Sequence, residues 1–124
     1  MPDPVWTVDD HLRGKPAASV VLYRRFVEIV NACGPTTTSV GKTLIAFKGT
    51  RRGFTGAKPT TQGVRGYFDV MRQITDRRVI SNTPYTSRLF VHQFRLTTLD
   101  DLDETFASYI REAYAVGQGA HVAK

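Results

Sequence analysis

The sequence predicts an α+β fold in which an antiparallel meander sheet of four to five strands is covered by N-terminal and C-terminal amphipathic helices. Three observations favour this class. Apolar residues recur at helical spacing near both ends, residues 36–96 are rich in Thr, Val, Phe, Tyr and Gly, and turn residues separate the short apolar runs of that segment. The 124 residues fit one domain, which we assign to residues 1–117, followed by a flexible tail over residues 118–124.

Two helices are expected before the sheet. Thr7 can cap a short helix over Val8–Arg13. A longer helix is expected over about Ala18–Cys33, because its apolar residues fall on one face and its polar residues on the other. Gly34 and Pro35 end this helix, since a glycine followed by a proline is a typical stop signal.

The middle of the chain contains five candidate strands. The threonines that precede the first of them suit an extended lead-in, and residues 82–84 are typical of a turn before the last one. Because the links between neighbouring runs are short, we expect antiparallel pairing in sequence order. The expected strands are Thr43–Lys48, Gly53–Ala57, Val64–Met71, Arg78–Ser81 and Arg88–Leu96.

The pattern after the sheet predicts a third helix. Thr98 can cap it, and three aspartates in its first turn suit the positive end of the helix dipole. Apolar residues at helical spacing form a stripe that would face the sheet, and Gly117 ends the helix.

Composition limits the compartment and the cofactors. Cys33 is the only cysteine, so no internal disulfide can form, and we expect a reducing compartment, the cytoplasm. The first ten residues lack an apolar run, so we expect no signal peptide, and no stretch approaches the ~18 apolar residues of a membrane span. No His, Cys or acidic residues show metal-site spacing, and we expect neither a metal nor a cofactor.

Positive charge is concentrated in the middle of the chain. Between Lys42 and Arg95 there are eleven basic residues and only the acids Asp69 and Asp76, whereas the two flanks together carry a small negative surplus. Such asymmetry favours an anionic partner, for example a nucleic acid, a nucleotide or an acidic protein. The alternative is an ordinary sheet whose solvent-facing positions happen to be arginine.

The triplet Gly41-Lys42-Thr43 ends like a phosphate-binding loop, but its context excludes one. That loop needs a glycine at position 36, where this chain has Thr36, and it needs a strand before it and a helix after it. Here a helix precedes and a strand follows. Lys42 therefore stands as an isolated cation at the start of a strand.

The segment from Arg65 to Arg72 begins like an RNA-recognition signature. The position that should be small holds Phe68, and the expected helix between the first two strands of that fold is missing. Generic base stacking on Tyr67 or Phe54 stays open, against the alternative of an ordinary hairpin with aromatic pairs. The nucleic-acid candidates are Arg51, Arg52, Phe54, Lys58, Arg65 and Arg72.

The last strand places His92 on the same face as Phe90, Phe94 and Leu96. If the phenylalanines face the core, His92 is buried among them, and its ring nitrogens then need hydrogen-bond partners. It is either a structural histidine or a general acid–base or anion ligand in a cleft.

Several ordered segments resemble the bacterial family called domain of unknown function 5655. They cover residues 8–16, 32–35, 42–47, 91–96 and 110–117, so the resemblance spans nearly the whole chain. That family is uncharacterised, and similar modules occur alone or joined to nuclease-like or other domains. The resemblance implies no established catalytic residues, but it directs attention to His11, Lys42 and His92 in the matching segments.

These observations favour a binding module whose cationic sheet or hairpin meets an anionic ligand, for example a nucleic acid. One alternative is an enzyme that acts on a small anionic substrate through His92 and Lys42. Another is a protein-interaction or homo-oligomeric domain that uses an uncovered sheet face or edge. The ligand-binding candidates are His11, Lys42, Tyr67, Arg88, His92 and Arg95.

Overall fold

The computed structural model describes residues 5–86 and 88–120. Helices α1 (Val8–Leu12) and α2 (Ala17–Cys33) precede the sheet, and a short 3-10 helix η1 (Leu99–Asp101) and helix α3 (Glu104–Gly117) follow it. The strands between them are β1 (Thr37–Val40), β2 (Ile45–Lys48), β3 (Gly53–Thr60), β4 (Gly63–Val70), β5 (Val79–Thr86) and β6 (Leu89–Leu96).

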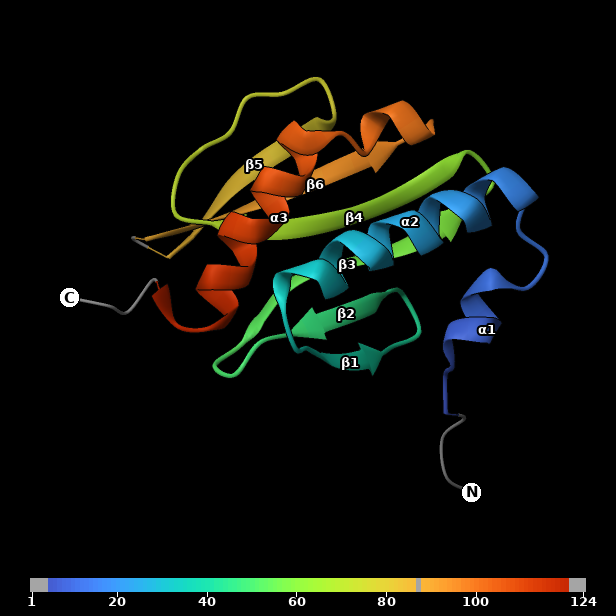
Figure 1. Cartoon of the computed structure of the whole chain (residues 1–124), viewed down its shortest axis with the longest axis horizontal. Coiled ribbons are helices and arrows are strands. Elements are labelled where there is room, and N and C mark those ends of the chain that lie inside the picture. Colours follow the sequence, from blue (N-terminus) through green and yellow to red (C-terminus); the bar gives the residue numbers. More distant parts are fainter. Residues whose placement is uncertain (1–4, 87, 121–124) are drawn as a thin grey trace.

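The six strands form one sheet in the order β1-β2-β3-β4-β6-β5, and every neighbouring pair is antiparallel. The first four strands are a meander, since each lies beside the next one along the chain. The last two are not, because β6 returns to lie between β4 and β5 (Figure 1). The α+β class is therefore confirmed, with six strands in place of four to five and with meander order only as far as β4.

Both edge strands differ from their predictions. The expected lead-in contains β1, which pairs with β2 from Thr37 to Val40 but is largely exposed and so lacks the apolar alternation that marks a strand. The expected turn at residues 82–84 is wrong, because β5 continues through Pro84 to Thr86. A proline is tolerated there since β5 is an edge strand, where one side of the backbone needs no partner.

Helices α2 and α3 cover the same face of the sheet, as Figure 1 shows. The ring of Phe26 in α2 contacts rings from the sheet and from α3. Its centroid lies 5.7 Å from that of Phe94, 6.1 Å from that of Phe47 and 6.4 Å from that of Phe106. These four rings are almost wholly buried, and each contributes roughly 1.5–3 kcal/mol of transfer free energy. No helix of the described chain covers the opposite face of the sheet.

Helix α3 has well-defined ends. Asp103 caps its start, where the carboxylate accepts a hydrogen bond of 2.9 Å from the backbone N–H of Phe106. Its end packs so closely on β3 that a Cβ atom at Gly117 would lie 2.6 Å from Cδ1 of Phe54. The predicted stop at Gly117 therefore reflects a close approach of backbone to an aromatic ring.

The predicted tail begins with a residue that contacts the domain. The side-chain oxygen of Gln118 accepts a hydrogen bond of 2.8 Å from the backbone N–H of Thr50, in the loop between β2 and β3. Residues 121–124 of the predicted tail lie outside the described residues.

Candidate functional site

The face of the sheet that the helices leave open carries the polar residues of β4 and its neighbours. In β4, Val64 and Phe68 are fully buried on the helix side, and Arg65 and Tyr67 alternate with them on the open side. The predicted strand Val64–Met71 corresponds to β4, and the polar positions of β4 define the candidate site.

Three cations stand side by side on this open face. Lys58 of β3 pairs directly with Arg65 of β4, which in turn pairs directly with Arg95 of β6. Adjacent strands lie about 4.8 Å apart, so the backbones that carry the three charges span roughly 10 Å. We call Lys58, Arg65 and Arg95 the cation row. No described acidic side chain forms an ion pair with any of them.

Like charges directly opposite each other destabilise a sheet. A row of three without an acidic partner therefore opposes folding, and it favours any anion that lies across it. Arg65 and Arg95 are exposed and Lys58 is half-buried, so the charged groups are accessible from solvent.

A hollow of about 190 Å³ adjoins the row. Lys58 and Arg65 line it together with Tyr67 and Gln93, which pair across β4 and β6. The Tyr67 ring packs over Gly56, where a Cβ atom would lie only 2.8 Å from Cε1 of the ring. Burial raises the pKa of Tyr67, so its hydroxyl stays protonated and can donate a hydrogen bond beside the cations.

Much of the remaining positive charge of the middle segment is neutralised in the folded chain. The acidic partners come from β4, from the stretch before β5 and from the start and middle of the last helical region, so the flanks supply part of the compensation. The pairs are Arg52–Asp69 at 2.7 Å, Arg72–Glu112 at 2.8 Å, Arg77–Asp101 at 2.6 Å, Arg78–Asp76 at 2.8 Å and Arg78–Asp103 at 2.7 Å. Folding therefore leaves the positive surplus of the middle segment on the cation row and on a few other exposed basic residues.

The other nucleic-acid candidates occupy three different settings. Phe54 is fully buried and packs edge-on against Tyr114, with ring centroids 5.4 Å apart, so its ring is not available to a base. Arg52 is engaged with Asp69 and also lies over the Tyr85 ring, 5.4 Å from its centroid. Arg51 is exposed in the loop between β2 and β3.

His92 is fully buried, and both of its ring nitrogens are engaged. Nε2 accepts a 2.9 Å hydrogen bond from the backbone N–H of Ile74, and Nδ1 donates to the carbonyl of Phe90 at 3.1 Å. The ring stacks on Phe68 with centroids 4.9 Å apart. Burial lowers the pKa of His92, which favours the neutral ring that this bonding requires. These contacts are those of a structural histidine.

His11 and Lys42 lie near each other, but His92 is not with them. His11 is buried, and its Nε2 donates a 2.7 Å hydrogen bond to the carbonyl of Gly41, the residue before Lys42. Lys42 is exposed in the turn between β1 and β2. Because β3 and β4 separate β2 from β6, and His92 has no exposed surface, Lys42 and His92 do not line a common cleft.

The comparisons with known proteins agree with the extent of this fold. A family model described as Domain of unknown function (DUF5655) matches residues 8–117. The chain belongs to this family. The matched range begins at the first residue of α1 and ends at the last residue of α3, so the DUF5655 domain and the α+β unit coincide. No curated protein and no solved structure matches the chain.

The part of the DUF5655 domain that the structure describes contains neither a cluster of metal ligands nor a helix that could span a membrane. Across residues 5–86 and 88–120, no three His, Cys, Asp or Glu side chains converge as metal ligands would. In the same residues, no helix has both the length and the apolar character that a bilayer crossing requires.

Sequence reasoning missed parts of the site in the DUF5655 domain. Gln93 lines the hollow but has no charge or aromatic ring that would single it out. Arg88 is the opposite case: it is one of the sequence-predicted candidates, but it precedes β6, is exposed and lies outside the cation row. The signal that could have found the row is the alternation in β4 and β6, which places Arg65 and Arg95 on the outer face once the two strands are known to pair.

Proposed function

We propose that this protein is a binding module whose open sheet face binds the phosphate backbone of a nucleic acid. The cation row is the observation that carries this function, because three adjacent cations without acidic partners form a site for a polyanion. Phosphate contacts of this kind supply most of the affinity of non-specific nucleic-acid binding.

The hollow beside the row supports the same function. The Tyr67 hydroxyl and the Gln93 amide add neutral hydrogen-bond donors next to the cations. Such donors commonly contact phosphate and sugar oxygens. The half-buried Tyr67 ring leaves little face for stacking, so we assign affinity to the phosphate contacts and expect weak sequence preference.

Fluorescence anisotropy with a labelled 20-nucleotide mixed-sequence DNA, single-stranded and as a duplex, tests this function. We expect saturable binding at low salt. Three phosphate contacts give a slope near −2 in log K against log salt for single strands, so affinity drops by about 100-fold between 20 and 200 mM salt. Absence of binding at 20 mM salt would overturn the proposal.

A charge-matched pair of variants locates the contact. The triple variant Lys58→Gln, Arg65→Gln, Arg95→Gln should lose the salt-dependent binding. The control variant Arg13→Gln, Arg25→Gln, Arg111→Gln loses the same charge from exposed positions outside the sheet and should retain the binding. Equal weakening by both variants would mean that net charge, and not the row, drives binding.

We also propose a cytoplasmic location. Cys33 is half-buried in α2, and its thiol contacts the carbonyl of Ile29 at 3.4 Å. Burial raises the pKa of this thiol, so it stays protonated and poorly reactive. A lone, protected thiol fits a reducing compartment, and fractionation of cells that produce the chain tests the location.

A further inference from the structure

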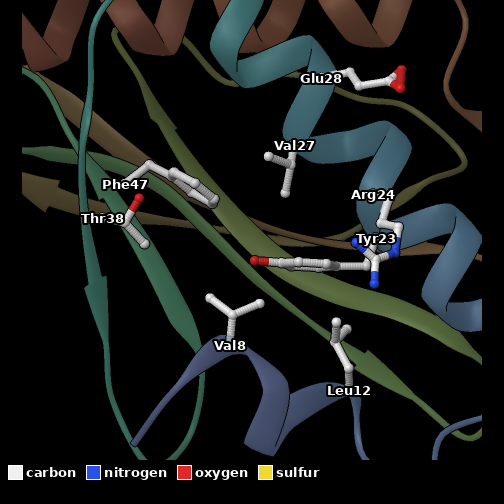
Figure 2. Close-up of a pocket in the computed structure, with 8 residues that line it drawn as sticks. All are labelled: Val8, Leu12, Tyr23, Arg24, Val27, Glu28, Thr38 and Phe47. Atoms are coloured by element: carbon white, nitrogen blue, oxygen red, sulfur yellow. The ribbon is translucent and has the colours of Figure 1, made fainter.

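A cavity of about 400 Å³ lies on the helix side of the sheet, across the sheet from the cation row. It is bordered by α1, α2 and the β1–β2 hairpin and is open to solvent on one side (Figure 2). Val8 and Leu12 of α1, Val27 of α2 and Phe47 of β2 provide apolar walls. Its volume falls within the roughly 300–1,000 Å³ of small-molecule sites.

Tyr23 places a hydroxyl inside this cavity. The residue is only 3% exposed, and its hydroxyl makes no hydrogen bond with any described residue. Figure 2 shows the hydroxyl directed across the cavity, toward Thr38 and Phe47. Asp69 Oδ1 is the one side-chain oxygen of the described chain that is fully buried without a partner, so the unpaired Tyr23 hydroxyl is accessible from the cavity and open to a ligand. Burial raises the pKa of Tyr23 to about 12, so the O–H remains a donor with no acceptor from the described chain.

The charge at the rim of the cavity is positive. Arg24 is exposed, lines the cavity and forms no ion pair or hydrogen bond with the described residues. Glu28 also lines it, but its carboxylate accepts a 3.0 Å hydrogen bond from Arg25 and points away from the Tyr23 ring in Figure 2. An anionic group on a ligand therefore meets the free guanidinium of Arg24.

We propose that this cavity binds a small aryl carboxylic acid that carries a polar group opposite its acid chain. The carboxylate pairs with Arg24 at the rim, the aromatic ring lies against Val8, Leu12 and Phe47, and the polar group accepts the hydrogen bond from Tyr23. Thr38 adds an exposed hydroxyl near that end of the cavity. The site shares no residue with the cation row and does not depend on nucleic-acid binding.

Isothermal titration calorimetry of the full chain with three probes tests each part of the proposal. The probes are 3-(4-hydroxyphenyl)propionate, the same acid without its hydroxyl, and the amide of the first compound. We expect the hydroxylated acid to bind tightest. The amide should bind at least several-fold more weakly, because it loses the charge-assisted bond to Arg24. No saturable heat with either acid up to 5 mM, or equal affinity for acid and amide, would overturn the proposal.

Two conservative variants assign the contacts. Tyr23→Phe should weaken binding of the hydroxylated acid by roughly 10-fold, because the hydrogen bond is lost. Binding of the acid without the hydroxyl should not change. Arg24→Gln should weaken binding of both acids and leave binding of the amide unchanged. The control Arg111→Gln, which alters an exposed residue of α3, should leave the affinity for all three probes unchanged. Equal loss for both acids in Tyr23→Phe would contradict the hydrogen bond.

A variant that fills the cavity tests the location of binding without relying on the contacts of Tyr23 and Arg24. Val27→Phe adds volume to a half-buried wall position and should abolish binding of both acids while the chain still unfolds cooperatively. Unchanged binding of the acids by Val27→Phe would place them elsewhere and overturn the proposal.

Discussion

Asp69 is a buried carboxylate whose two oxygens have different surroundings. Oδ2 accepts a 2.7 Å hydrogen bond from Arg52, and Oδ1 is buried without a partner in the described chain. Loss of water raises the pKa of Asp69 to about 6, and the neighbouring guanidinium of Arg52 offsets only part of this effect. The ion pair is thus weaker than its geometry suggests, because half of the carboxylate is unsatisfied.

This residue should impose a pH dependence of unusual sign. Between pH 4 and 6 the unfolded chain releases the Asp69 proton and the folded chain retains it, so the free energy of unfolding falls as the pH rises. We expect the stability of the wild type relative to Asp69→Asn to drop by about 2 kcal/mol from pH 4 to pH 7. Urea titrations of both proteins at four pH values measure this difference. Curves that stay parallel across the range would contradict the unsatisfied carboxylate.

At the scale of elements, Arg78 connects the start of β5 to the last helical region. Its guanidinium donates to Asp76 and Asp103 and to the backbone carbonyl of Asp101, and it lies 5.8 Å from the centroid of the Phe106 ring. The side chain is only 6% exposed. Hydrogen bonds from Arg78 hold the pKa of Asp76 well below its usual range.

Removing this guanidinium takes the countercharge from the nearly buried Asp76 carboxylate and a donor from the Asp101 carbonyl. We expect Arg78→Met to destabilise the fold by about 3–5 kcal/mol, as is typical for breaking one side of a buried pair. Arg72→Met is the control, because Arg72 and its partner Glu112 are 57% and 40% exposed and loss of this surface pair should cost less than about 1 kcal/mol. Chemical denaturation at pH 7 compares the two variants. Similar losses of unfolding free energy would show that the burial of Arg78 does not determine its contribution to stability.

The helices could be predicted from the sequence because their signals are local. Thr7 caps α1 as expected, and the expected boundaries of α2 lie within about a residue of those observed. The α3 helix itself begins at Glu104, since Thr98 caps η1 and Asp103 takes over the cap of α3. The order of β5 and β6 was not predictable in this way, because it depends on which of the two strands pairs with β4, and no local signal in the sequence shows that.

The candidate site was predictable only in part. The residue types of the cation row are visible in the sequence, but their adjacency depends on the register between β3, β4 and β6. A shift of one residue would move Arg65 to the other face. The sequence likewise cannot show that the Tyr23 hydroxyl lacks a partner, since that depends on the placement of α1 over α2.

For the whole molecule, the cation row implies a conflict between stability and binding. Arg65 lies between Lys58 and Arg95, so Arg65→Glu converts two repulsive cross-strand pairs into two attractive ones. We expect this variant to gain about 0.5–2 kcal/mol of stability at low salt and to lose nucleic-acid binding. Thermal denaturation at 20 and 500 mM salt, with anisotropy at 20 mM, measures both effects. Arg13→Glu, at an exposed position, is the control and should show no such gain.

The position of β6 also sets an order of events during synthesis. The sheet from β1 to β4 can assemble as the chain leaves the ribosome, because each strand follows its partner. The next strand to emerge, β5, pairs only with β6, which is made after it. A nascent chain halted before Leu89 therefore carries β5 as an unpaired segment, and release of the last strand closes the sheet on both sides at once, against β4 and β5.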